Sequence, residues 1–174
     1  MGLSYQNLDG ETRAFMLEEL EISVAADKIY VSSYLSEVGK VDWLPLLRAA
    51  CENGSDETLG IALRSNGRLN TKALRRKPKG GYTEVDVPVT AHETLSEGQF
   101  NRLYIRALCR RALAQGVSTV KVYRAAEREH ERPASVALID THLDAQELLD
   151  KLRDALDFNS GFPEPNTGLC VTHS

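Results

Sequence analysis

The chain has 174 residues, of which 26% are charged and 42% are hydrophobic, and its formal net charge at pH 7 is −4. This length suits one domain with a sizeable core, and the composition is typical of a globular protein. There is no run of eighteen apolar residues and no basic, then apolar leader, so the sequence predicts neither a membrane span nor a signal peptide. The three cysteines are widely spaced and odd in number, which argues against a disulfide framework and favours a reducing, cytoplasmic setting.

Charge is distributed unevenly along the chain. Residues 1–62 carry four basic against eleven acidic side chains, residues 63–132 carry fifteen against seven, and residues 133–174 carry two against seven. The chain is therefore acidic, then basic, then acidic. A layout of this kind bears on partners and association rather than on fold.

The acidic first portion, residues 1–63, is predicted to be largely helical. A first helix is expected to begin just after Asn7 or Asp9, either of which can cap it, and to end near Asp27. The segment at residues 28–35 is short and rich in β-branched and aromatic residues, which predicts a strand or an extended segment. The glutamates expected on the solvated face of the first helix are Glu11, Glu18, Glu19 and Glu21.

Two short helices are expected next. Asp42 is predicted to cap the first, at residues 43–51, where Pro45 falls in the opening turn and its missing N–H is not needed. Ser55 is predicted to cap the second, at residues 56–64, which an Asn-Gly pair then ends.

The composition changes abruptly at residues 64–81, which contain seven basic residues and no acid. This segment has no periodic apolar face and closes on a proline and two glycines, so it is predicted to be a long, mobile, basic loop. Two interpretations are open: a solvated linker, or an arm that orders against an anionic surface. Its basic residues are Arg64, Arg68, Lys72, Arg75, Arg76, Lys77 and Lys79.

Residues 82–157 are predicted to form an α/β core. Alternation at residues 82–89 predicts a strand with one buried face, and residues 117–125 and 135–140 are expected to supply two more strands. A last amphipathic helix is expected to follow, capped by Asp144. The leucines on its apolar face are Leu148, Leu149, Leu152 and Leu156.

A long, largely buried helix is predicted between Thr94 and Gly116, and the rest of the chain is expected to pack around it. Thr94 and Glu97 have the spacing of a capping box, and Gly116 supplies the left-handed residue that commonly ends a helix. Apolar residues cover most of the circumference, and what remains is basic. Three arginines spaced four apart form one row on this helix: Arg102, Arg106 and Arg110.

This row of arginines has two possible roles. The first is to face a partner outside the subunit, because guanidinium groups aligned on one side of a helix suit an anionic surface. The second is to pair with carboxylates of the same fold, because the helix is so apolar that it is expected to be buried.

Together these elements predict an α+β fold in a single domain of residues 1–174. A helical N-terminal portion is followed by a strand-helix-strand-strand-helix unit whose helices pack on a small sheet. Residues 158–174, rich in Gly, Pro and Asn, are expected to be an irregular tail.

No motif with a specific chemistry occurs in the sequence. Phosphate-binding loops, dinucleotide fingerprints, zinc-finger spacings and aromatic RNA-recognition strands are missing. The candidate groups are Cys109, Cys170 with His173, Asp140 with His142, and Glu84 with Asp86. Each has a simpler structural explanation, so the sequence predicts no catalytic residue, no metal ligand and no cofactor.

Two functions from different classes fit the charge layout. In the first, the protein is a non-enzymatic, self-associating structural or scaffolding component, a homo-oligomer whose basic middle contacts acidic surfaces of neighbouring subunits. This is analogous to small structural proteins of phages and mobile elements. In the second, the basic segment binds nucleic acid through phosphates, and a metal-dependent nuclease is a third, less favoured class. The anion- or partner-binding residues expected are Arg68, Lys72, Arg75, Arg76, Lys77, Lys79, Arg102, Arg106 and Arg110.

Overall fold

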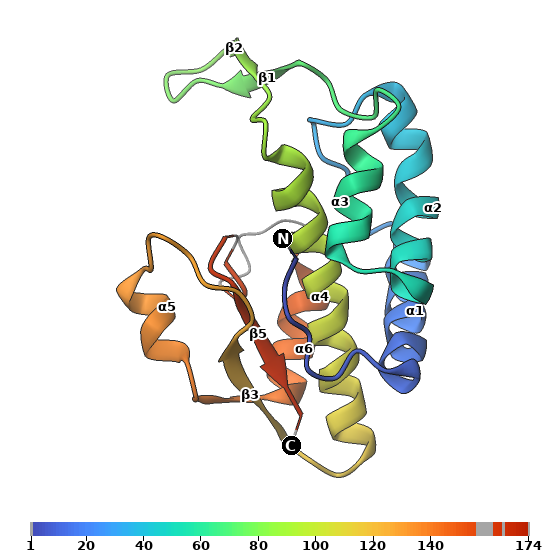
Figure 1. Cartoon of the computed structure of the whole chain (residues 1–174), viewed down its shortest axis with the longest axis vertical. Coiled ribbons are helices and arrows are strands. Elements are labelled where there is room, and N and C mark those ends of the chain that lie inside the picture. The colour runs from blue at the N-terminus through green and yellow to red at the C-terminus, as the bar shows by residue number, and fades with distance from the viewer. Residues whose placement is uncertain (1, 156–161, 165, 174) are drawn as a thin grey trace.

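The computed structural model describes residues 2–155, 162–164 and 166–173, and its fold is α+β, as the sequence predicts (Figure 1). The helices are α1 (Gly10–Ala25), α2 (Glu37–Asn53), α3 (Asp56–Arg64), α4 (Ala91–Ala114), α5 (Pro133–Leu138) and α6 (Ala145–Asp154). The strands are β1 (Lys72–Arg76), β2 (Tyr82–Asp86), β3 (Thr119–Arg124), β4 (His142–Asp144) and β5 (Leu169–Thr172). None of the helices in the described part of the chain has both the length and the apolar character needed to cross a bilayer.

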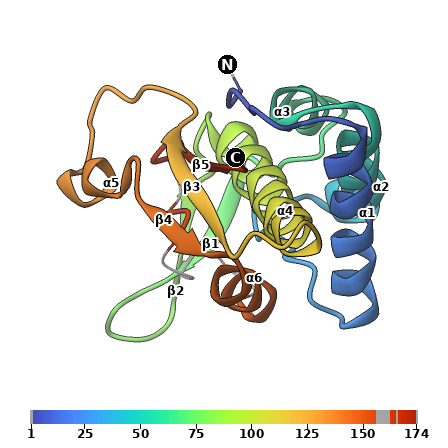
Figure 2. The same ribbon diagram turned by 90° about the horizontal axis from the view of Figure 1, so that it is seen from below.

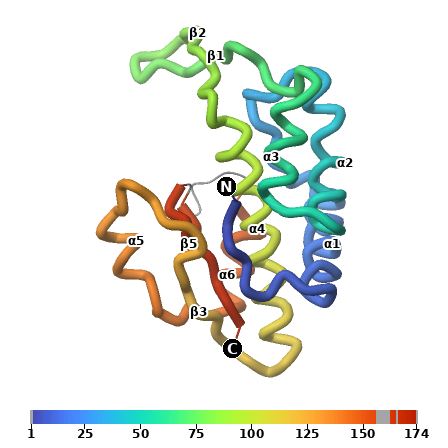
Figure 3. Tube along the Cα trace, viewed as in Figure 1, coloured from blue at the N-terminus to red at the C-terminus, as the bar shows by residue number. Residues whose placement is uncertain are grey.

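Helix α4 forms the centre of the molecule. Helices α1, α3 and α6 pack along its sides, and β3 and β5 also contact it, as the end-on view in Figure 2 shows. Most of its side chains are buried, including the rings of Phe100 and Tyr104. The N-terminal segment crosses α4 (Figure 3) and places the ring of Tyr5 against both of these rings. The prediction of a long, buried helix around which the chain packs is therefore confirmed.

The start of α4 differs from the prediction. The helix begins at Ala91, because the Ala-His-Glu tripeptide before Thr94 is itself helical and adds almost one turn at the N-terminal end. Thr94 and Glu97 therefore lie inside the helix and do not form a capping box, and Glu97 instead accepts a hydrogen bond from Arg128 at 2.5 Å. The other end is as predicted, since Gly116 has a left-handed φ of 75°.

Helices α1 and α3 begin where their capping residues predict. Asp9 caps α1 by accepting a hydrogen bond from the Thr12 N–H at 3.0 Å. Ser55 and Thr58 form a reciprocal capping box at the start of α3. Short polar side chains at these two positions satisfy backbone N–H groups that a helix leaves unpaired.

Helix α2 begins more than one turn earlier than predicted. Ser36 caps it by accepting a hydrogen bond from the Gly39 N–H at 3.1 Å. Asp42 is therefore not a cap, and Pro45 lies inside the helix rather than in its opening turn. Gly39 permits this arrangement, because a Cβ at that position would lie 2.0 Å from the carbonyl oxygen of Arg68.

The basic segment is a β-hairpin, not the mobile loop that was predicted. Residues 64–81 contain β1, which pairs antiparallel with β2 just beyond them, and the register joins Lys72 to Asp86 and Arg76 to Tyr82. The composition of β1 gives no alternation of apolar and polar residues, so its pairing depends on the partner strand and the turn. The hairpin projects away from the body of the molecule (Figures 1 and 3).

A three-stranded antiparallel sheet, in the order β4-β3-β5, packs beside α4. Val120 and Val122 of β3 are buried, as the alternation predicts. Residues 135–140, predicted as a strand, lie mostly in α5, because Pro133 sets the backbone for a first helical turn. The expected irregular tail contributes β5, whose Leu169, Cys170 and Val171 are buried.

Helix α6 follows the prediction. Asp144 caps it by accepting a hydrogen bond from the Glu147 N–H at 2.8 Å. Leu148, Leu149 and Leu152 are buried in the core. The fourth predicted core leucine, Leu156, lies outside the described residues.

Candidate functional site

The first residue of the arginine row, Arg102, is directed into the subunit. It is buried, and its guanidinium donates hydrogen bonds to the carbonyl oxygens of Leu152, at 3.1 Å from Nε, and of Ala155. These carbonyls lie at the C-terminal end of α6, where a helix leaves acceptors without intrahelical partners. Arg102 therefore joins α6 to α4.

The second residue, Arg106, pairs with a fully buried carboxylate, that of Glu19. Its Nε donates to Glu19 Oε2 and its Nη1 donates to Ser23 Oγ, both at 2.8 Å. Arg153 of α6 donates to Glu19 Oε1 at 2.5 Å, so this carboxylate joins α1, α4 and α6. Burial alone would raise the pKa of Glu19, but the hydrogen bonds from Arg153 and the charge of Arg106 hold that pKa below its ordinary value.

The third residue, Arg110, is half-buried and also engaged internally. Its Nη1 lies 2.7 Å from Glu18 Oε2 and 3.4 Å from Glu19 Oε1, and its guanidinium lies over the ring of Phe15. The arginine row is therefore matched within the subunit, as the second interpretation of the sequence expects. It does not form the partner-facing surface that the first interpretation expects. Glu19, expected in solvent, is instead the centre of this cluster.

Two further predicted binding residues, at the base of the hairpin, are also engaged. Arg68 donates to Asp42 Oδ2 at 2.7 Å. Lys72 Nζ lies 3.3 Å from Asp86 Oδ1 and 3.7 Å from Glu84 Oε1. The two carboxylates that suggested a metal-dependent nuclease therefore share a lysine.

The cations that remain gather at the far end of the hairpin. Arg75 and Arg76 close β1, and Lys77 and Lys79 lie in the turn that follows. None of these four side chains makes an ion pair or a hydrogen bond with a described residue, and the one other Lys or Arg side chain in that state among the described residues is Arg64. We call Arg75, Arg76, Lys77 and Lys79 the hairpin tip.

The turn of the hairpin is built by its glycines. The Lys77 N–H donates to the Gly81 carbonyl at 2.9 Å, and the Gly80 N–H donates to the Lys77 carbonyl at 3.1 Å. Gly80 and Gly81 have φ values of 90° and 78°, in the left-handed region that glycine enters without strain. The turn thus holds the lysines in solvent on an ordered backbone.

One face of the hairpin is exposed along its length. The register and the alternation of side chains place Leu74, Arg76 and Tyr82 on this face, and Leu74 and Tyr82 are each 66% exposed. The opposite face is partly covered at its base, where Ala73 is buried and Val85 is half-buried. Exposed apolar side chains therefore stand directly beside unpaired cations.

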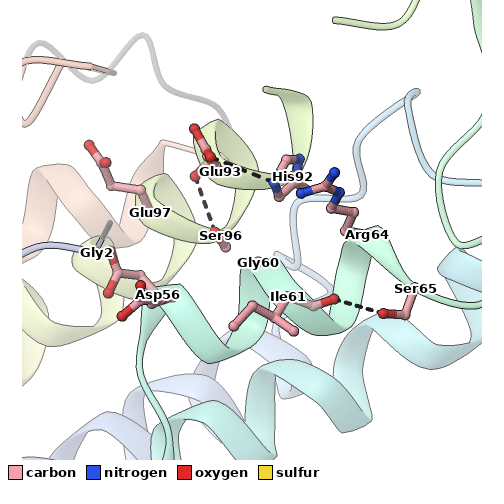
Figure 4. A pocket seen from close by; sticks show the side chains of 11 residues that line it. Gly2, Asp56, Gly60, Ile61, Arg64, Ser65, His92, Glu93, Ser96 and Glu97 are labelled. Carbon is pink, nitrogen blue, oxygen red and sulfur yellow. Dashed lines mark hydrogen bonds and ion pairs between the residues drawn. The ribbon is translucent and has the colours of Figure 1, made fainter. Parts of the chain in front are cut away.

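A cleft of about 460 Å³ lies between α3 and α4 (Figure 4). The helices approach closely at Gly60, where a Cβ would lie 2.9 Å from Ser96 Oγ. Arg64 and His92 line one end of this cleft. The acidic side chains that line the cleft are Asp56, Glu57, Glu93 and Glu97. We call it the α3–α4 cleft.

Asp56 is the buried member of this acidic group. Asp56 is only 2% exposed, and its Oδ2 accepts a hydrogen bond from the Leu3 N–H at 2.9 Å. Oδ1 is buried and has no hydrogen-bond partner among the described residues. Burial raises the pKa of Asp56, and the charge of Glu97 raises it further.

The cysteine candidates have structural roles. Cys109 is fully buried, and this burial raises the pKa of its thiol to about 12, which disfavours the nucleophilic thiolate. Cys170 Sγ lies 3.0 Å from Asn101 Oδ1, and His173 Nε2 lies 2.5 Å from Gln115 Oε1. The tail pair is therefore divided between two separate contacts.

The strand-end candidate is likewise occupied, since Asp140 Oδ1 lies 2.7 Å from Lys121 Nζ while His142 begins β4. Within residues 2–155, 162–164 and 166–173, no group of three or more His, Cys, Asp or Glu side chains is placed to hold a metal ion.

Sequence reasoning did not identify the α3–α4 cleft. Two signals point toward it. Glu93 and Glu97 are spaced four apart, which places both on one face of a helix. Gly60 in the middle of a helix is unfavourable unless close packing requires it. What the sequence does not give is which helix faces Glu93 and Glu97.

The hairpin tip and the α3–α4 cleft are thus two surface features whose charged side chains are incompletely matched by the described residues. The chain matches no protein-family model, no curated protein and no solved structure.

Proposed function

We propose that this protein is a non-enzymatic, self-associating structural component, and that its basic hairpin binds an acidic surface of a neighbouring copy. The observation that carries this proposal is the position of the unpaired cations. Four of them lie together at the hairpin tip, on an arm that projects from the body, while most other basic side chains of the described residues are matched within the subunit. An arm of this kind is positioned to meet another molecule.

A protein partner suits this arm better than a phosphate backbone does. Leu74 and Tyr82 expose apolar surface beside Arg76, and such surface gains free energy when it is removed from water against a protein. The chain as a whole is acidic, with a sequence pI near 5.6, so copies of it offer each other many carboxylates. Opposite charges on one chain favour contacts between copies.

Nucleic-acid binding is the second candidate, and one observation favours it. The hairpin is a two-stranded ribbon, an element that can enter a groove of DNA, and its tip carries Arg and Lys side chains. Against it, the arginine row that would have extended the basic surface is engaged inside the subunit. The metal-dependent nuclease gains no support, because Lys72 lies between its two carboxylates.

Light scattering after size-exclusion chromatography tests this proposal. We expect wild-type protein to elute as an oligomer at about 0.05 M NaCl and to dissociate at about 0.5 M NaCl, because salt screens exposed charges. The hairpin variant, Arg75→Glu with Arg76→Glu, should be monomeric at both concentrations. Lys40→Glu with Lys151→Glu makes the same charge change at exposed positions on α2 and α6 and should assemble like wild type.

Titration with fluorescent duplex DNA and single-stranded RNA separates the two candidates. If the protein self-associates through the hairpin, wild type should show no more salt-dependent binding to DNA or RNA than the hairpin variant does. A wild-type protein that stays monomeric at low salt, yet binds DNA or RNA through the hairpin tip, would replace self-association with the second candidate.

A further inference from the structure

We propose that the α3–α4 cleft is the receptor for the hairpin tip of a second copy, so that copies associate head to tail. This inference rests on the proposed function and names the surface that the hairpin binds. Its basis is that the tip and the cleft are opposite in charge, that both carry exposed apolar side chains, and that the cleft has room for several side chains.

The charges of the two surfaces are opposite. The tip presents four cations that make no ion pair or hydrogen bond with a described residue, and the cleft presents carboxylates from two helices, with Arg64 as its one Lys or Arg side chain among the described lining residues. Glu57 is exposed on α3, and Glu93 is exposed on α4, where its Oε1 lies 3.7 Å from His92 Nε2. A guanidinium or ammonium group placed between these helices would therefore meet carboxylates from both sides.

Asp56 adds a buried acid to the negative charge of the cleft. It lies at the end of the cleft near Gly2, and its Oδ1 is buried without a hydrogen-bond donor among the described residues (Figure 4). A buried carboxylate oxygen left in this state is unfavourable unless a donor or a positive charge is supplied. A cation bound in the cleft would lower this cost through its charge.

The apolar parts of the two surfaces also correspond. Ile61 lines the cleft on the α3 side and is 63% exposed. Leu74 and Tyr82 stand beside Arg76 on the exposed face of the hairpin. An arm that places its cations among the carboxylates can bring these apolar side chains toward Ile61, where contact removes them from water.

The cleft is large enough for several side chains, since its volume of about 460 Å³ lies within the roughly 300–1,000 Å³ of clefts that hold small molecules. The tip does not fill the cleft of its own copy. In Figure 1 the hairpin turns away from α3, and no ion pair joins the tip to the cleft among the described residues. The contact is therefore between copies.

A contact between two different surfaces is heterologous. A pair of copies joined in this way still has one unoccupied tip and one unoccupied cleft. Such an interface repeats until it closes into a ring or grows as a filament. This property gives a test that does not depend on knowing the final assembly.

The test uses two variants that are each defective on one side. The hairpin variant, Arg75→Glu with Arg76→Glu, lacks a functional tip but keeps its cleft. The cleft variant, Glu57→Gln with Glu93→Gln, keeps its tip but neutralises two exposed carboxylates of the cleft, so that its cleft does not attract the reversed tip of the hairpin variant. We expect each variant alone to be monomeric by light scattering and native mass spectrometry. Mixed in equal amounts, they should form a one-to-one heterodimer that grows no further, because one intact tip meets one intact cleft.

Two controls accompany the mixture. Glu52→Gln with Glu127→Gln neutralises two exposed acids outside the cleft and should assemble like wild type. Circular dichroism and thermal unfolding of every variant check that a monomer is a folded monomer.

Every outcome bears on one of the two proposals. A cleft variant that assembles like wild type, beside a monomeric hairpin variant, would overturn the cleft as receptor while leaving self-association through the hairpin in place. Two monomeric variants that form no heterodimer on mixing would also overturn the head-to-tail contact. A wild-type protein that is monomeric at low salt, or a hairpin variant that assembles normally, would overturn self-association itself.

Discussion

The arginine row of α4 and the hairpin tip carry the same kind of charge and have opposite surroundings. Each of Arg102, Arg106 and Arg110 contacts carboxylates or backbone carbonyls of its own subunit. The tip cations make no ion pair or hydrogen bond with a described residue. The difference follows from position. Because α4 is covered on most sides, a charge on it lies in a low-dielectric interior, where leaving it unpaired would cost free energy. A two-stranded arm in solvent imposes no such requirement.

This comparison shows what a cluster of basic residues in a sequence does and does not indicate. Spacing predicts that three guanidinium groups share a helix face, but the helix's own apolar character decides whether that face is open. In this protein the buried row joins α4 to α1 and α6, and the tip is exposed, where we propose that it meets a partner. A substitution in the row should therefore alter stability, whereas a substitution in the tip should alter association.

The largest expected effect concerns Glu19, the carboxylate at the centre of the buried cluster. Glu19→Gln leaves Arg106 buried beside a neutral amide, and removing one partner of a buried ion pair typically costs about 3–5 kcal/mol. Urea unfolding followed by circular dichroism should show a loss of this order. Because the folded pKa of Glu19 is lowered, its contribution is present above the ordinary value of 4.5 and is lost as the pH falls below it.

Glu18→Gln is the matched control for that experiment. Glu18 is the adjacent residue and pairs with Arg110, but its side chain is largely exposed, so its removal should cost less than about 1 kcal/mol. Equal losses for the two variants would mean that burial does not distinguish these ion pairs.

Several parts of the fold could be predicted from the sequence because local chemistry determines them. Asp9, Ser55 and Asp144 cap helices where their side chains predict, and the alternation around Val120 and Val122 identifies a buried strand. These signals depend on neighbouring residues alone.

Other errors, beyond the local ones at the starts of α2, α4 and α5, occur where distant residues decide the structure. The strand β1 has no alternation of its own and exists because β2 pairs with it, and β5 in the expected tail is added to the sheet by β3. Glu19 looks like a solvated helix residue until α4 and α6 bring Arg106 and Arg153 to it. The cleft depends in the same way on which helix packs against which.

A smaller effect is expected at Asp56, which is buried like the arginine row but incompletely paired like the tip. Because its folded pKa is raised above the ordinary value of 3.8, any stability it gives is full below that value and declines as the pH rises through the folded pKa. Asp56→Asn removes this decline. We expect the variant's unfolding free energy relative to wild type to increase with pH, by about 1 kcal/mol near pH 8. Urea titrations between about pH 4 and pH 8 measure this trend.

Glu57→Gln controls for the loss of a negative charge in the first turn of α3, because Glu57 occupies the next position and is exposed. A relative stability of Asp56→Asn that is the same at every pH would show that the buried carboxylate does not oppose its own ionisation.

The smallest effect on stability is expected at the hairpin tip, and this is what separates the two clusters most sharply. Arg75→Gln with Arg76→Gln should change the unfolding free energy by less than about 0.5 kcal/mol, because these exposed side chains make no ion pair or hydrogen bond with a described residue. Unfolding must be measured at a protein concentration where wild type is monomeric, since association would otherwise stabilise it by mass action.

Raising NaCl from about 0.1 to 1 M shortens the Debye length from about 10 to 3 Å, so it should weaken association while leaving the buried cluster largely unscreened. If salt or tip neutralisation destabilised the monomer by several kcal/mol, the tip cations would have partners inside the subunit after all, and the contrast between a structural and an interactive basic cluster would fail.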